Sequence, residues 1–107
     1  MSNVNNVRIK PVDIELNGEK HTLCYDLNAF AELEVKYGTV EKALNAMEKG
    51  SFGAIRCFIW AGMLRDNENI TERQVGALIT PGQLQDLAKK IGEALEQAAP
   101  TGNKNPN

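Results

Sequence analysis

The chain has 107 residues, of which 42% are hydrophobic and 24% are charged, so it has room for one domain with one modest core. Its formal net charge of −2 excludes the overall positive field that draws a protein to nucleic acid. Because no basic amphipathic segment indicates a membrane surface either, we expect a small globular protein that works without nucleic acid or membrane.

The chain is expected to open with a β-hairpin. Residues 1–11 are predicted to be a flexible lead-in, and they lack the apolar stretch of a signal peptide. Apolar and acidic residues then alternate in VDIEL, residues 12–16, which predicts a half-buried strand. Asn17-Gly18 favours a two-residue turn, since a type I′ turn requires positive φ at both central residues. The return strand is expected over residues 19–25.

Two helices are predicted to follow the hairpin. Asp26 or Asn28 can cap the first, which ends at Gly38, and Thr39 caps the second, which ends at Gly50. Four residues at helical spacing form the apolar stripe of the first helix: Leu27, Phe30, Leu33 and Tyr37.

The stretch SFGAIRCFIWAGML, from Ser51 to Leu64, begins with a serine that can cap a helix. It is apolar on nearly every side of a helical wheel. A helix that is hydrophobic all round is buried. This one is too short, and interrupted too early by Arg56, to cross a bilayer. We therefore predict a central buried helix, with Phe52 and Ile55 on one inner side and the other elements wrapped over it.

Two charged residues interrupt apolar faces. Glu34 falls between Leu27 and Phe30 on the wheel of the first helix, and Arg56 falls within an apolar side of the central helix. Because burying a lone charge is costly, we predict a structural ion pair between Glu34 and Arg56 inside the bundle. Stacking of Arg56 on Trp60 is the alternative. Paired charges more often fix packing than do chemistry.

Two more helices complete the predicted domain. Thr71 and Gln74 form a capping box for a short helix up to Ile79, and the last helix begins at Thr80-Pro81. The result is a single α+β domain over residues 12–99, a hairpin packed on about five helices. Residues 100–107 are too polar to bury anything and are predicted to be a disordered tail.

The residues that commonly carry chemistry are few. Cys24 and Cys57 are expected to be reduced, buried thiols in a cytoplasmic protein. His21, opposite Ile14 in the hairpin register, could join Cys24 only in a two-ligand site, short of a structural zinc set. Neither a nucleophile–base pair nor a metal set is visible. A small enzyme is therefore the third and least favoured interpretation, and we predict that the protein is not an enzyme and needs no cofactor.

The last two helices invite a second interpretation. Residues Thr71 to Leu95 superficially resemble a helix-turn-helix, whose second helix needs basic and amide residues at its start. Gln83 and Gln85 stand there, but Asp86 and the negative net charge argue against DNA. A small DNA-binding or regulatory protein remains the alternative.

The order of these elements resembles a known family. The hairpin leads into YDLNAFAELEVKYG, then CFIWAGML, then ITERQVGALI and an amphipathic last helix. This arrangement is similar to the small tail assembly chaperones of long-tailed bacteriophages and gene transfer agents. The likeness runs from about Val12 to Ala98. Its most telling parts are Leu33-Glu34 followed by Tyr37-Gly38, the run from Trp60 to Leu64, and the segment from Thr71 to Ile79.

The resemblance implies a protein that binds the hydrophobic tape measure protein and keeps it soluble in the bacterial host cytoplasm while tail tube subunits polymerise. Some members are also made as a longer frameshifted product that recruits the tail tube protein. A homo-oligomer is a further expectation, since an idle apolar patch tends to be covered. The expected partner-binding surface follows the hairpin edge and the margin of the last helix: Val12, Ile14, Leu16, Leu84, Ile91 and Leu95.

Overall fold

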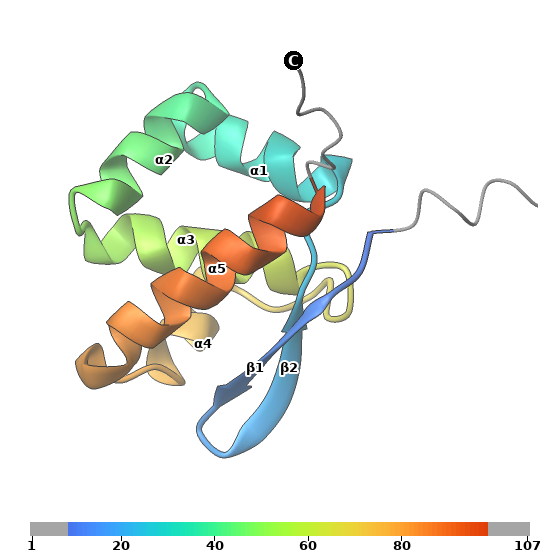
Figure 1. Ribbon diagram of the computed structural model, residues 1–107, viewed down its shortest axis with the longest axis vertical. Coiled ribbons are helices and arrows are strands. Elements are labelled where there is room, and N and C mark those ends of the chain that lie inside the picture. The colour runs from blue at the N-terminus through green and yellow to red at the C-terminus, as the bar shows by residue number, and fades with distance from the viewer. Residues whose placement is uncertain (1–8, 99–107) are drawn as a thin grey trace, which may run out of the picture.

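The computed structural model describes residues 9–98 and has the expected α+β architecture (Figure 1). The hairpin lies beside a bundle of helices, and the last helix crosses in front of the central one. The elements are β1 Val12–Leu16, β2 Glu19–Leu23, α1 Leu27–Tyr37, α2 Val40–Glu48, α3 Phe52–Met63, α4 Glu72–Ala77, the short 3-10 turn η2 Pro81–Gln83, and α5 Leu84–Ala98. Most of the predicted lead-in, and all of the predicted tail, lie outside the described residues.

The hairpin has the predicted turn and register. β1 pairs antiparallel with β2, with Leu16 opposite Glu19 and Ile14 opposite His21. Asn17 and Gly18 have φ of 52° and 80°, as a type I′ turn requires. Because side chains alternate along a strand, this register sends Leu16, Ile14 and Leu23 into the core.

Each helix before α5 begins at a side-chain cap predicted from the sequence. The Asp26 carboxylate accepts a hydrogen bond from the backbone N–H of Ala29, at 3.0 Å. Thr39 and Ser51 cap α2 and α3 in the same way. Thr71 caps α4 within the predicted capping box. These caps satisfy backbone donors that have no partner inside the helix, which fixes where each helix starts.

The central helix α3 contacts α1, α2, α4, α5 and β2. Its buried residues come from several sides of the helix, as predicted: Ala54, Ile55, Cys57, Phe58, Ile59, Ala61, Gly62 and Met63. Two residues that were predicted to be buried are instead exposed. Phe52 is 69% exposed and Leu27 is 82% exposed. Each is the first residue of its helix.

The C-terminal half of α3 is closed by the chain that leaves the hairpin. The Tyr25 hydroxyl donates to the Phe58 carbonyl at 2.7 Å, and the Cys24 backbone N–H donates to the Gly62 carbonyl at 2.9 Å. A Cβ atom on Gly62 would lie 2.9 Å from Leu23 Cδ2 and 3.1 Å from Tyr25 Cζ. Only a glycine lets the two segments approach this closely without displacing these side chains.

Candidate functional site

The predicted ion pair between Glu34 and Arg56 is wrong. Glu34 is exposed, and the carboxylate near Arg56 is that of Glu72, whose Oε2 lies 3.9 Å from Arg56 Nε. The reason is the rotation of α1, which buries the face carrying Ala29 and Leu33 rather than a face centred on the predicted stripe. Glu34 follows Leu33 in the chain and therefore turns about 100° away from that buried face.

Glu72 joins three helices. Lys36 Nζ of α1 lies 2.6 Å from Glu72 Oε1, while Arg56 of α3 approaches the other carboxylate oxygen. The hydrogen bond to Glu72, together with the negative charge of its carboxylate, raises the pKa of Lys36. The Glu72 side chain is only 15% exposed, so its two cationic neighbours offset the cost of covering it. This arrangement links α1, α3 and α4 and has a structural role.

Arg56 lies between this cluster and an open groove. Its stem packs over α4, because a Cβ atom on Gly76 would come within 3.0 Å of Arg56 Cδ. Arg56 Nε is shielded from solvent and has no hydrogen-bond partner among the described residues. The side chain as a whole is still 41% exposed. Part of the guanidinium group is therefore available to a partner.

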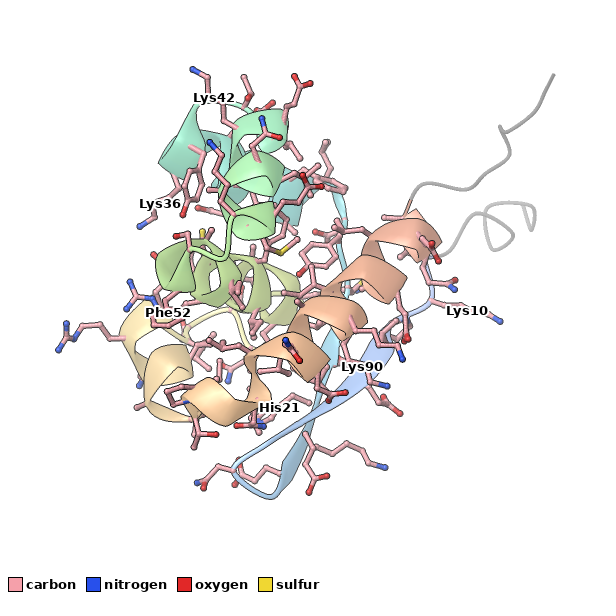
Figure 2. The ribbon with its side chains drawn as sticks, turned by 60° about the vertical axis from the view of Figure 1, so that its left-hand side comes forward. Lys10, His21, Lys36, Lys42, Phe52 and Lys90 are labelled. Atoms are coloured by element: carbon pink, nitrogen blue, oxygen red, sulfur yellow. The ribbon has the colours of Figure 1, made fainter. Side chains whose placement is uncertain are left out.

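The groove lies where the start of α3 meets α4 and the turn into α5. It encloses about 510 Å³ and is lined mainly by apolar side chains, including Phe52, Ile79, Pro81 and Leu84, with Arg56 and Arg73 as its charged residues. Phe52 lies at the side of the molecule near the start of α3 (Figure 2). Of the residues predicted to bind a partner, Leu84 is half-buried and belongs to this groove.

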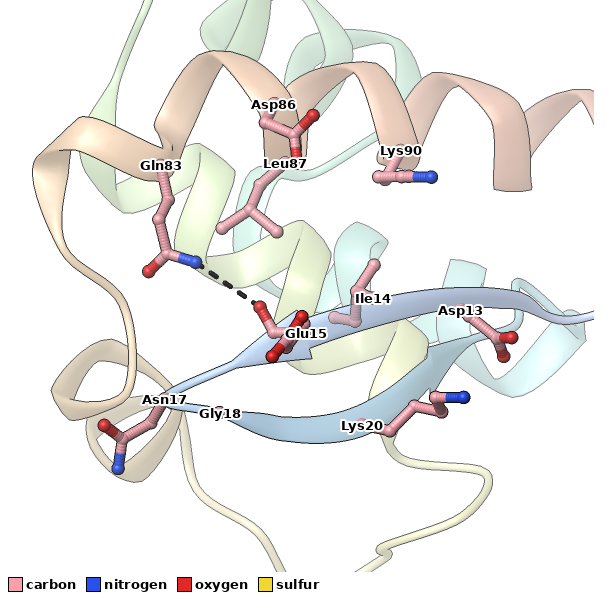
Figure 3. A pocket seen from close by; sticks show the side chains of 10 residues that line it. All are labelled: Asp13, Ile14, Glu15, Asn17, Gly18, Lys20, Gln83, Asp86, Leu87 and Lys90. Carbon is pink, nitrogen blue, oxygen red and sulfur yellow. Dashed lines mark hydrogen bonds between the residues drawn. The ribbon is translucent and has the colours of Figure 1, made fainter.

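A second groove, of about 780 Å³, separates β1 from the start of α5 (Figure 3). Acidic and basic side chains share its lining, with Asp13, Glu15 and Asp86 opposed by Lys20 and Lys90. The Gln83 amide group donates across it to the Glu15 carbonyl at 3.3 Å, a bond drawn dashed in Figure 3. With three acidic and two basic side chains in its lining, this groove has no excess of positive charge.

The prediction that the hairpin edge and the margin of the last helix form a partner-binding surface is largely wrong. Leu16 and Ile91 are fully buried in the core, and Ile14, which borders this groove, is only 4% exposed, so none of the three offers an apolar surface to a partner. Val12 and Leu95 are half-buried and pack against that core. The hairpin and α5 pack together through their apolar faces, so polar residues make up most of the lining of the groove between them.

The cysteines and the histidine lie apart from both grooves. Cys24 and Cys57 are buried and form no disulfide, as predicted. Arg65 Nη1 donates to Cys24 Sγ at 2.9 Å, and burial raises the pKa of the Cys57 thiol to about 12. His21 is partly covered, with Nε2 3.5 Å from the Glu19 carboxylate. Within residues 9–98, no three His, Cys, Asp or Glu side chains are grouped to hold a metal ion.

In the helix pair suggested for DNA binding, the first helix is short and one of the two amide side chains is already hydrogen-bonded. The helix α4 has six residues. Gln83, one of the two amides suited to read bases, accepts a hydrogen bond from the Thr80 backbone N–H and donates to Glu15. Asp86 is exposed on the first turn of α5, where its charge would repel phosphate.

Comparisons with protein-family models, with curated proteins and with solved structures found no match. Among residues 9–98, no helix is both long enough and apolar enough to span a bilayer.

Proposed function

We propose that the protein is a tail assembly chaperone that binds a hydrophobic helical segment of the tape measure protein in the cytoplasm of the bacterial host. The observation that carries this proposal is the apolar groove at the start of α3, with Phe52 69% exposed at its edge. The family resemblance supplies the identity of the partner. The tail tube protein is the second partner that this resemblance implies.

Phe52 is exposed although most residues of α3 are buried, so its ring is free to pack against a partner. Burying a phenylalanine side chain against a partner contributes roughly 1.5–3 kcal/mol. Aromatic and arginine residues are also the types most often found where binding energy concentrates in an interface. Phe52, Arg56 and Arg73 combine these types in one groove. Recognition of an amphipathic helix in a groove suits such a surface.

A chaperone of this kind must keep its partner soluble while leaving it free to be transferred. A groove open at the surface favours this behaviour over an enclosed cavity, since a partner can leave without unfolding of the domain. The same groove could be covered by a second copy of the chain when no partner is present, which is why a homo-oligomer belongs to the proposal.

The test is co-expression with the tape measure protein encoded in the same genome. We expect the tape measure protein to move from the pellet to the soluble fraction and to co-purify with this chain. Expression of the tape measure protein alone is the control. If it stays insoluble in both cases, and the chain instead shifts duplex DNA in a salt-dependent way, the DNA-binding alternative replaces the proposal.

A further inference from the structure

The groove at the start of α3 carries charge of one sign. Its only charged lining residues among those described are Arg56 and Arg73, and no aspartate or glutamate lines it. The nearby carboxylate of Glu72 is already engaged by Lys36 at 2.6 Å. The whole chain has a net charge of −2, so this local positive charge runs against the overall balance. The groove between β1 and α5 lacks this bias.

We propose that this groove recognises an amphipathic helical segment of a partner protein through both an apolar and an acidic feature. Apolar side chains of the segment pack against Phe52, Ile79 and Leu84, while its aspartate or glutamate side chains pair with Arg56 and Arg73. This inference rests on the proposed function and defines the class of segment that the chaperone selects. It follows that a hydrophobic segment without acidic side chains should bind more weakly.

The two arginines suit carboxylates in complementary ways. Arg73 is exposed and can reach a partner at the rim. Arg56 is held in place by its packing over Gly76 and by Glu72, so less side-chain entropy is lost when it binds. A guanidinium group can also bind a carboxylate with two parallel hydrogen bonds.

The elements around the groove favour a helix over an extended strand as the occupant. The lining residues belong to α3, α4, the Pro81 turn and the start of α5, and none belongs to β1 or β2. An extended peptide gains its affinity from the free backbone groups of a strand edge. Because no such edge borders the groove, recognition there depends on side chains, as when the apolar stripe of an amphipathic helix enters a groove.

The test uses two synthetic amphipathic peptides of about 16 residues, long enough to populate a helix. Both carry leucines along one face, flanked by glutamates in one peptide and by lysines in the other. Titrations into the full isotope-labelled chain are followed by the amide NMR signals of Gly53 and Gly76, which line the groove. We expect these signals to shift with the glutamate peptide, and its dissociation constant to be at least about tenfold lower than that of the lysine peptide.

Matched variants locate the binding energy. Phe52→Ser and Arg73→Glu should each weaken the glutamate peptide about tenfold or more. The controls are Val35→Ser, whose side chain is 82% exposed, and Lys89→Glu, which reverses the charge of an exposed lysine. Both should leave binding unchanged. Arg73→Glu should also reverse the preference, so that the lysine peptide binds more tightly than the glutamate peptide.

Three results would overturn the inference: equal binding of both peptides, shifts confined to the Asn17-Gly18 side of the molecule, or no binding of either peptide. If duplex DNA shifts the same NMR signals, and Arg73→Glu abolishes this binding, the groove is assigned to nucleic acid instead. The outcomes separate this inference from the proposed function. If the Phe52→Ser and Arg73→Glu variants still solubilise the tape measure protein, the groove is not the docking site but the chaperone function stands. If the glutamate peptide binds selectively but the tape measure protein stays insoluble, the inference about the groove stands and the chaperone function is rejected.

Discussion

The two ends of α3 are built from similar residues but have opposite surroundings. At the C-terminal end, Gly62 is buried against Leu23 and Tyr25. At the N-terminal end, Phe52 is 69% exposed, and a Cβ atom on Gly53 would have Ser51 Oγ as its nearest contact, at 3.8 Å. One end is closed by the chain leaving the hairpin, while the other opens into a groove.

The difference shows that the covering elements, and not the helix itself, decide which apolar residues become core. The segment after β2 crosses the end of α3 and places the Tyr25 hydroxyl on the Phe58 carbonyl. At the other end, the neighbours are the six-residue helix α4 and the turn at Pro81. These neighbours leave Phe52 69% exposed, so a single helix provides both the centre of the core and one wall of a surface groove.

Alkaline pH should have the largest effect on stability, because it acts on two groups that are buried in the core, the thiol of Cys57 and the hydroxyl of Tyr25. Burial raises the pKa of Cys57 from 9.0 to about 12, and it raises the pKa of Tyr25 well above its ordinary value of 10.0. Between these values the unfolded chain loses protons that the folded chain keeps, so stability present below pH 9.0 declines as the pH rises toward 12.

Denaturant titrations from neutral pH to about pH 11 measure this decline. Tyr25→Phe should make it shallower, because one of the two groups is removed, whereas Phe52→Ser at the open end should leave its slope unchanged. A free energy of unfolding that stays constant over this range would contradict the burial of both groups.

The next largest effect should come from Gly62→Ala. The added methyl group would clash with the buried side chains of Leu23 and Tyr25, and overpacking of this kind costs about 1–3 kcal/mol. Gly53→Ala on the same helix is the matched control. It meets nothing closer than 3.8 Å, and alanine is the better helix former, so stability should hold or rise by up to about 1 kcal/mol. Equal losses in thermal unfolding would remove the contrast between the two ends.

A smaller effect is expected at the charge cluster. Glu72→Gln removes the carboxylate shared by Lys36 and Arg56 and should cost about 1 kcal/mol, since both cations are partly exposed and solvent weakens such pairs. The control, Glu34→Gln, changes an exposed carboxylate and should stay within about 0.5 kcal/mol. Urea unfolding of the two variants measures the contrast, and a larger loss for Glu34→Gln would restore the predicted Glu34–Arg56 pair.

Local signals in the sequence predicted most of the fold. The Asn17-Gly18 turn and the strand alternation specified the hairpin register, and the caps at Asp26, Thr39 and Ser51 specified where helices begin. Each of these features depends on residues within a few positions of one another, so a single sequence contains the information.

The candidate site could not be predicted in the same way. The charged partner of Arg56 is set by the rotation of α1 and the position of α4, and neither is encoded by a short pattern. Glu72 stands in a polar first turn, where an acidic residue is already favoured by the helix dipole. It therefore gave no signal of a tertiary contact. Phe52 looked like a core residue because an apolar pattern does not reveal where the covering elements end.

The measurement that tests the central claim most directly compares stability with partner binding in Phe52→Ser and Gly62→Ala. Each variant is co-expressed with the tape measure protein at a temperature where both variants are folded, and its melting temperature is measured separately. We predict that Phe52→Ser melts like the unchanged protein but loses the co-purifying tape measure protein, whereas Gly62→Ala melts lower and keeps it. Retention of the partner by Phe52→Ser, at an unchanged melting temperature, would contradict the assignment of the open end of α3 as the docking surface.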